Sequence, residues 1–294
     1  MIDYIKFTMT DSTEIQKVWN NPDLQYHSEV NFMIKETGEL KTTYRKTYKN
    51  MFFKLLDNTL EINGSLHKLY NNGIHNSNNF SRIQCISLLR NFCGKFGIPP
   101  AKAFVSTLEF GLNFQTQVAV NEILLSIRFL GKYGFRRDKD LDYMYFAGTK
   151  YFRLKIYNKS LQPPFLAPEN TLRLEWKTEE SKYLRRNGCE TLQDLFSPQI
   201  YLTFSHIILE KWDDILLFDF RKKRFRTYFH TEYWLDTIKA KCLNTFKNRK
   251  RKYYEDLGKT NLHSQIYKLM RHKLELLNDC RFSTDFHEPK YLIS

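Results

Sequence analysis

Three segments of the sequence alternate apolar side chains with side chains that could bind a metal ion or attack a phosphate. They span residues 107–114, 151–159 and 171–177. Side chains alternate between the two faces of a β-strand, so each segment has one apolar and one polar face. The polar faces carry Glu109, Asn113, Arg153, Lys155, Tyr157, Lys159, Arg173 and Glu175.

If the three strands share one sheet, these residues are suited to cutting DNA. Carboxylates can hold Mg²⁺ or Mn²⁺, which polarises a phosphodiester, and a tyrosine oxygen can attack the phosphorus beside stabilising cations. A second interpretation stays open and is favoured by alternation alone. It is an antiparallel sheet with a charged solvent face, on which Glu109 and Glu175 pair with Arg153 or Arg173.

The surrounding pattern predicts the elements that position these strands. Strands are expected at 2–9, 29–35, 51–56 and 60–69, with a turn at Asp57-Asn58. Ser81 and Gln84 form a capping-box pattern that opens a helix ending at Gly97. A helix is expected at 120–130, and after Lys177 the pattern turns helical, with helix starts at Thr191 and at Ser197-Pro198.

The order of these motifs resembles rolling-circle replication initiators of the Rep_trans type and the related replication proteins of filamentous phages. The resemblance lies in segment 145–162 with its Ile156-Tyr157-Asn158-Lys159, followed by Leu172-Arg173-Leu174-Glu175. Segments 1–7, 64–69 and 107–110 are similar to further blocks of that family. The similarity covers roughly residues 1–200.

The resemblance implies a role for each site residue. Tyr157 would be the nucleophile that keeps the 5′ phosphate, Lys159 and Lys155 would stabilise the phosphate, and Glu109 and Glu175 would bind Mg²⁺ or Mn²⁺. The sequence departs from the family at Gln162, where an acid is usual, and at Thr107, where an arginine is usual. The metal site is therefore expected to lack one carboxylate.

Other residue types compete for these roles. The sequence has no His-x-His triplet, the metal motif of better-known initiators and relaxases, and we expect surface or loop positions for His67 and His75. Tyr145, Tyr151 and the pair Tyr253-Tyr254 are alternative nucleophiles. Tyrosine is more often a packing residue than a nucleophile, so the choice of Tyr157 rests on the motif.

The net charge of +14 predicts a polyanionic partner. Residues 221–273 hold 16 Lys and Arg but four Asp and Glu, so most of the excess lies there. The basic runs are interleaved with Phe225, Tyr228, Phe229, Tyr253 and Tyr254, which is typical of a nucleic-acid surface, although a solvated helix face is the alternative. The expected DNA-binding residues are Arg221, Lys222, Lys223, Arg224, Arg249, Lys250, Arg251 and Lys252.

Several protein classes are excluded by composition. Charged residues interrupt every apolar run before the roughly 18 residues of a membrane span, and the first residues do not read as a secretory signal. The five cysteines lack a CxxC pair, which favours buried reduced thiols over disulfides or zinc. We therefore expect a soluble protein in the host cytoplasm.

Together these observations predict an α+β protein. Residues 1–195 would form an antiparallel sheet with helices on one face, a HUH/Rep-like nicking domain without the His-x-His motif, and residues 196–294 a basic helical DNA-binding region. The expected function is replication initiation on a small circular phage or plasmid genome by metal-dependent tyrosine transesterification. Its partners would be single-stranded or hairpin origin DNA and the host helicase and polymerase. A relaxase or transposition-type nickase and a non-enzymatic DNA-binding protein remain the alternatives.

Overall fold

The computed structural model describes residues 1–239 and 243–278 and divides them between two compact units. The first unit comprises Met1–Phe110 and Lys177–Thr203, and the second contains Gly111–Trp176 together with the described residues from Phe204 onward. Strands β6 (Phe104–Gln115) and β12 (Thr171–Thr178) each run through both units. Each unit is described by itself below.

The first unit is built on an antiparallel sheet in the order β2-β3-β4-β5-β1-β6. Its other strands are β1 (Ile2–Met9), β2 (Gln25–Met33), β3 (Leu40–Tyr48), β4 (Met51–Leu56) and β5 (Thr59–Ser65). Its helices are α1 (Ser12–Trp19), α2 (Leu66–Tyr70), α3 (Arg82–Phe96) and α5 (Ser181–Arg186), with short 3₁₀ turns η1 (Pro100–Lys102) and η3 (Asp194–Phe196).

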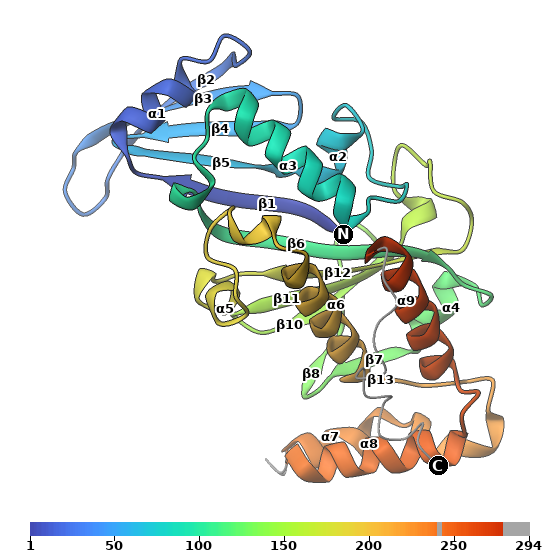
Figure 1. The fold of residues 1–294 in the computed structure, drawn as a ribbon. Helices are drawn as coiled ribbons and strands as arrows, with labels where there is room; N and C mark the ends of the chain where they lie inside the picture. The colour runs from blue at the N-terminus through green and yellow to red at the C-terminus, as the bar shows by residue number, and fades with distance from the viewer. Residues whose placement is uncertain (240–242, 279–294) are drawn as a thin grey trace. The chain divides into compact units, whose positions relative to one another are not determined.

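Helix α3 covers one face of this sheet because its apolar residues meet those of β4 (Figure 1). Phe53 of β4 packs against Phe92 and Phe96, at ring-centroid distances of 6.1 and 5.2 Å. The helix begins with the predicted capping box, in which Gln84 and Ser81 bond to each other's backbone N–H. It ends at Gly97, whose left-handed φ of 67° suits glycine.

Strand β1 contains a register shift that changes which face its first residues occupy. Ile2 pairs with Phe110 of β6, whereas Ile5 pairs with Leu108, so one extra residue lies between them in β1. Such a bulge re-aims the neighbouring side chains. Beyond it Ile5, Phe7 and Met9 are buried while Tyr4, Lys6 and Thr8 are partly exposed on the other face.

Some predicted elements of the first unit were wrong. The strand expected at 60–69 ends at Ser65, whose side chain accepts a hydrogen bond from Lys68 N–H and caps α2 instead. The pattern did not indicate helix α1 or strand β3. The turn at Asp57 is confirmed, with a positive φ of 49°.

The second unit contains the strand order β6-β12-β11-β10-β9 and a small sheet in the order β13-β7-β8. Its further strands are β7 (Ile127–Leu130), β8 (Tyr133–Gly134), β9 (Arg136–Arg137), β10 (Met144–Gly148), β11 (Phe152–Asn158) and β13 (Ile215–Leu217). Its helices are α4 (Val120–Ser126), α6 (Pro198–Asp213, shared with the first unit), α7 (Thr231–Lys239), α8 (Leu243–Leu257) and α9 (Leu262–Asn278), with 3₁₀ segments η2 (Lys159–Leu161) and η4 (Lys223–Phe229).

Contacts within each unit fix the antiparallel register of β6 and β12. Thr116 N–H bonds to Asn170 O, and Leu108 N–H bonds to the Thr178 hydroxyl. The residue numbers of both pairs sum to 286, which places Gly111 opposite Glu175 and Asn113 opposite Arg173. A Cβ at Gly111 would lie 2.8 Å from Leu174 O and 3.0 Å from the Glu175 Cγ. Glycine at this position therefore allows the close approach that Glu175 requires.

The helical part of the second unit has its own aromatic core. It consists of Phe129, Leu216, Phe218, Trp234, Phe246, Tyr253, Tyr254 and Leu257. Helix α6 begins at Pro198 as predicted, and its Phe204 ring lies 5.6 Å from that of Trp176 in β12. The expectation of helices alone after Lys177 was wrong because Ile215–Leu217 pairs with β7, which also replaces the end of the helix expected at 120–130.

The predicted fold class, α+β with a large antiparallel sheet and helices, is confirmed. The two compact units do not follow a single cut in the sequence, and the division into a nicking domain and a DNA-binding region stays a prediction. Cys85, Cys93 and Cys189 are free and buried as expected, whereas Cys242 and Cys280 lie outside the described residues. Within 1–239 and 243–278, no helix has the length and apolarity of a membrane span.

Candidate active site

The hydroxyl of Tyr157 is held by Glu175 in the second unit. Tyr157 in β11 donates a hydrogen bond of 2.9 Å to Oε1 of Glu175 in β12. The Nε of Arg173 donates to the same oxygen, and Lys155 Nζ lies 3.0 Å from Oε2. We call these four residues the glutamate cluster.

The glutamate cluster is largely buried, and the charge of Glu175 is balanced by Lys155 and Arg173. The side chains of Glu175 and Arg173 are 4% and 2% exposed, and Tyr157 is 2% exposed. Burial alone would raise the pKa of Glu175, but the charges of Lys155 and Arg173 outweigh it and hold that pKa well below its usual range. Glu175 is therefore ionised at neutral pH. Its carboxylate accepts the hydrogen bond from the Tyr157 hydroxyl and so positions that hydroxyl.

Neighbouring strands orient the cluster. Arg173 Nη1 donates a hydrogen bond of 2.8 Å to Asn113 Oδ1, which joins β12 to β6. Asn113 was one of the polar-face residues singled out from the sequence. Because Arg173 bonds to both Asn113 and Glu175, the orientation of its guanidinium group toward the Glu175 carboxylate is fixed.

Lys159 follows Tyr157 by two residues and is also buried. Its Nζ hydrogen-bonds to the amide oxygen of Gln162 and lies 6.0 Å from the centre of the Tyr157 ring. Gln162, which stands where the resembled family usually has an acid, is thus an uncharged hydrogen-bond partner of Lys159. Its amide holds the ammonium group beside Tyr157.

Two further carboxylates belong to the first unit. Asp3 in β1 accepts hydrogen bonds from the Ser65 hydroxyl at 2.6 Å and from Asn76 Nδ2 at 2.8 Å, and it is 5% exposed. Glu109 in β6 lies 3.7 Å from Lys177 Nζ, its partner in the β6–β12 register. The Lys177 ammonium also lies 5.9 Å from the Tyr4 ring.

Asp3, Glu109 and Glu175 each offer one carboxylate oxygen, and these oxygens lie within 4.8 Å of one another. Glu109 and Glu175 were predicted from the sequence, whereas Asp3 was missed. Alternation places Asp3 on the apolar side with Ile5 and Phe7, and only the bulge in β1 changes its direction. A signal was present, because an aspartate at an apolar position of a strand is costly unless it has partners.

The chemistry of these donors fits a hard divalent cation. Three carboxylate oxygens are ligands that Mg²⁺ and Mn²⁺ prefer. Lys155 and Lys177 already face two of the carboxylates, but their side chains are 20% and 28% exposed and can turn toward solvent. The sequence predicted a metal site short of one carboxylate because Gln162 replaces an acid. Asp3 brings the number of carboxylates in this group to three.

The remaining candidate residues lie elsewhere. Arg153 stacks over the Phe146 ring at 5.5 Å, and Tyr151 is 40% exposed. His67 was expected in a surface or loop position but is buried in α2, where its ring bonds to Asn78 Oδ1. The pairing that the second interpretation predicted occurs between Glu175 and Arg173.

The aromatic residues predicted to stack on bases pack in or against the aromatic core, Phe225, Tyr228 and Phe229 being partly buried against it. Tyr253 and Tyr254 are buried, and their hydroxyls bond to the backbone of segment 215–219. Burial raises the pKa of Tyr253 well above that of a free tyrosine. These two residues build the aromatic core, so we assign them no base-stacking role.

The predicted DNA-binding residues also differ in exposure. Lys223, Arg224, Arg251 and Lys252 are exposed. Arg221 is paired with the buried Asp219, and Arg249 lies over the Tyr233 ring at 4.2 Å. Lys250 is 8% exposed and donates to the Asp213 carbonyl, while burial lowers its pKa. Lys250 therefore holds α8 against the end of α6.

Comparison with known proteins gives one distant likeness. No protein-family model matches the chain. No curated protein matches it either. Among solved structures the chain is similar to a rolling circle replication initiator protein from Geobacillus stearothermophilus, with a TM-score of 0.37 and 9% identity, over 67% of this chain and 78% of that one. A likeness of this degree carries no argument about residues or mechanism.

Proposed function

We propose that this protein nicks and rejoins one strand of DNA to initiate replication of a small circular genome. The observation that carries the proposal is the hydrogen bond from the Tyr157 hydroxyl to Glu175, with Lys155, Arg173 and Lys159 close by. A tyrosine hydroxyl fixed among cations is suited to attack on a phosphodiester. The sequence resemblance to replication initiators, stated on Tyr157, Lys159 and Glu175, supports the same roles.

The proposed reaction is a transesterification. The Tyr157 hydroxyl loses its proton as its oxygen bonds to phosphorus, the bond between phosphorus and the 3′ oxygen breaks, and that oxygen takes up a proton and leaves as a 3′-OH, so the step consumes no net proton. The DNA 5′ phosphate is then an ester of Tyr157, and reversal rejoins the strand. Lys155 and Lys159 stabilise the charge on the phosphate oxygens.

Asp3, Glu109 and Glu175 would hold the metal ion. When bound, Mg²⁺ or Mn²⁺ supplies Lewis-acid polarisation of the scissile phosphate. Lys155 and Lys177 would then release their carboxylates, so Lys155 becomes available to the phosphate. Tyr157 must leave its buried position for the same step, since it is 2% exposed beside Glu175.

The surface of the basic region would bind the origin DNA. Lys223, Arg224, Arg251 and Lys252 are exposed cations of η4 and α8, and they can neutralise DNA phosphates with release of counterions. Lys222 and Arg249 are partly exposed and can add to this surface.

A non-enzymatic DNA-binding protein is the second candidate, and one observation favours it. Glu175 is already balanced by Lys155 and Arg173, and Tyr157 is closed off beside it. A glutamate cluster of this kind could simply stabilise the sheet. The protein would then bind origin DNA without forming a covalent bond.

An adduct assay separates the two candidates. The protein is incubated with Mn²⁺ and labelled single-stranded DNA that spans the cognate origin, and covalent complexes are resolved under denaturing conditions. We expect an adduct with the wild type and none with Tyr157→Phe, while Tyr151→Phe serves as the matched control and keeps it. DNA binding without any adduct would support the non-enzymatic candidate, and an adduct in Tyr157→Phe would overturn the role of Tyr157.

A further inference from the structure

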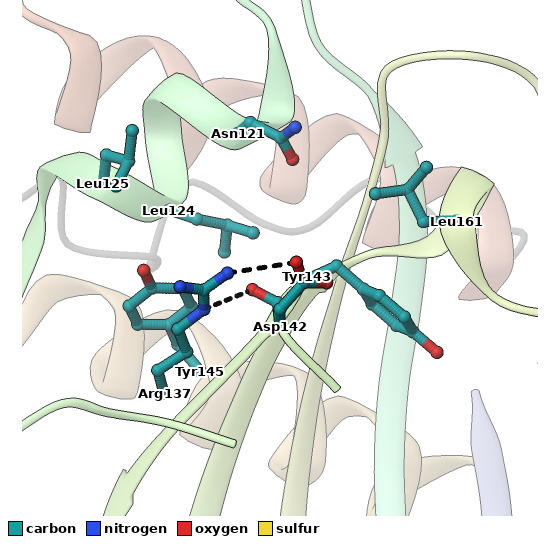
Figure 2. Close-up of a pocket in the computed structure, with 8 residues that line it drawn as sticks. All are labelled: Asn121, Leu124, Leu125, Arg137, Asp142, Tyr143, Tyr145 and Leu161. Carbon is teal, nitrogen blue, oxygen red and sulfur yellow. Dashed lines mark hydrogen bonds and ion pairs between the residues drawn. The ribbon is translucent and has the colours of Figure 1, made fainter. Parts of the chain in front are cut away.

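A pocket of about 200 Å³ in the second unit takes no part in the chemistry proposed above. Figure 2 shows its lining, with Asn121 and Leu124 of α4 facing Asp142, Tyr143 and Tyr145 at and before β10. Leu125, Arg137 of β9 and Leu161 of η2 complete it.

The pocket is connected to the residue that follows Tyr157. Asn158 donates its backbone N–H to Tyr143 O at 3.1 Å and its side-chain amide to Asn121 Oδ1 at 3.1 Å. Leu161 lies one short turn further along the chain. A group bound in the pocket would therefore lie at the C-terminal end of β11. Because Tyr145 pairs with Ile156, the pocket is on the face of the sheet opposite to the Tyr157 side chain, and a DNA strand would pass this end of β11 to reach Tyr157.

The lining residues suit an uncharged planar ligand better than a phosphate. Among the described residues that line the pocket, the only cation is Arg137, which donates its Nε to Asp142 O at 2.8 Å and pairs with the Asp142 carboxylate at 3.1 Å. A phosphate would therefore meet a compensated arginine and a carboxylate. Leu125 and Leu161, by contrast, leave 61% and 42% of their surface exposed and gain from apolar cover.

The polar groups at the pocket can bond to the edge of such a ligand. Asn121 Oδ1 accepts the hydrogen bond from the Asn158 side chain, so the amide NH₂ of Asn121 is the group that can donate to a ligand. The Asp142 carboxylate is 79% exposed and offers an acceptor. The rings of Tyr143 and Tyr145 add surfaces on which a planar group can stack.

We propose that this pocket binds one base of the DNA strand, within a few nucleotides of the phosphate that Tyr157 attacks. The proposal rests on the proposed function and adds to it a means of selecting the nick site. Donor, acceptor and stacking surface together match a base turned out of its neighbours' stack. The bound base would fix the register of the strand and so decide which phosphate reaches Tyr157.

The test uses single-stranded origin DNA in which each nucleotide around the nick is replaced, one at a time, by an abasic site. Affinity is measured by fluorescence anisotropy, and the nicked position by sequencing-gel electrophoresis. We expect one abasic position to weaken wild-type binding on the order of ten-fold. In Tyr143→Leu that penalty should largely vanish, because the base no longer stacks there.

Two further variants keep this test decisive. Asn121→Ala changes an exposed side chain and should also reduce the penalty if Tyr143→Leu fails to fold. Tyr26→Leu removes a tyrosine that is 68% exposed in the first unit and should keep the full penalty. The two pocket variants should also nick the DNA at more than one position on the sequencing gel.

The outcomes separate the pocket from the proposed function. Binding and nicking with an equal abasic penalty in the wild type and both pocket variants would overturn the pocket's role and leave the nicking proposal standing. An absence of DNA binding by the wild type would overturn both. A penalty that also vanishes in Tyr26→Leu would show a general effect and would overturn the pocket's role.

Discussion

Glu175 joins the other residues of the glutamate cluster. Tyr157, Arg173 and Lys155 all contact its carboxylate, and it lies opposite Gly111. Removing its charge would leave two cations near or in the interior without compensation. The same residue therefore bears on stability and on the position of the Tyr157 hydroxyl.

We expect Glu175→Gln to lower the free energy of unfolding by about 3 kcal/mol, because Arg173 stays buried without its counterion. The matched control is Glu109→Gln, whose partner Lys177 is partly exposed, with an expected loss below about 1 kcal/mol. Urea denaturation measures both. Equal losses in the two variants would contradict the stabilising role of the glutamate cluster.

Gly111 tests the close approach of β6 to Glu175. An added methyl group would meet Leu174 O at 2.8 Å, so we expect Gly111→Ala to cost about 1–3 kcal/mol and to reduce nicking. Gly94→Ala is the control, since nothing lies within 4 Å of its added Cβ in α3, and alanine there should stabilise by up to about 1 kcal/mol. Normal nicking by Gly111→Ala would show that Glu175 tolerates displacement.

At the residue scale, the sequence predicted the polar faces better than their partners. Glu109, Asn113, Arg173 and Glu175 were identified because strict alternation marks them. Asp3 was not, since the bulge that turns it depends on how β1 pairs with β6. The role of Gly111 was likewise hidden, because it follows from the residue opposite it on another strand.

At the scale of elements, His263 joins α9 to the end of α6. Its Nε2 donates to Trp212 O at 2.9 Å, the Trp212 indole donates to His263 O at 3.1 Å, and the two rings stack at 5.3 Å. Burial, together with the charge of Lys250, lowers the pKa of His263 to about 3. The imidazole is therefore neutral in the folded protein.

This lowered pKa predicts acid sensitivity. In the unfolded chain His263 binds a proton below about pH 6.5, whereas in the fold it does so only near pH 3, so stability falls as the pH drops between these values. At pH 5 the loss from this group is about 2 kcal/mol. Thermal unfolding of the wild type and His263→Gln at pH 7 and pH 5 measures it.

The control for this prediction is the exposed His272 of α9, and His272→Gln should keep the wild-type pH dependence. If His263→Gln loses as much stability on acidification as the wild type, another group must be responsible for the acid sensitivity.

Element boundaries that depend on local capping were predictable. The start of α3 at Ser81 and the start of α6 at Pro198 follow from nearby residues alone. The end of β5 and the pairing of β13 with β7 were not, because the spacing of Leu66 and Leu69 and the short apolar run Ile215–Leu217 each suit either a helix or a strand. Tertiary pairing decides such segments.

At the scale of the whole molecule, some of the residues that carry the excess positive charge are used in structural contacts. Most of it lies in residues 221–273, but Lys250 and Arg221 are tied to backbone or to Asp219. The exposed cations that remain on η4 and α8 are those that the proposed DNA-binding surface would use.

We expect the double variant Arg251→Gln/Lys252→Gln to weaken DNA binding. The slope of log affinity against log salt should also fall by about one for each phosphate that the variant no longer neutralises. Lys250→Met, at the neighbouring buried position, should leave that slope unchanged. Anisotropy titrations from low to high salt provide the comparison, and an unchanged slope in the double variant would identify this helix face as merely solvated.

The most direct measurement of the central claim is the position of the DNA–protein bond within the chain. Trypsin separates the candidate tyrosines, since Tyr157 lies in peptide 156–159, Tyr151 in 151–153 and Tyr145 in 140–150. After reaction with origin DNA and Mn²⁺ and digestion by nuclease and trypsin, mass spectrometry identifies the modified peptide. We predict a nucleotide on peptide 156–159. A nucleotide on another peptide, or none after DNA has bound, would contradict the assignment of Tyr157 as the nucleophile.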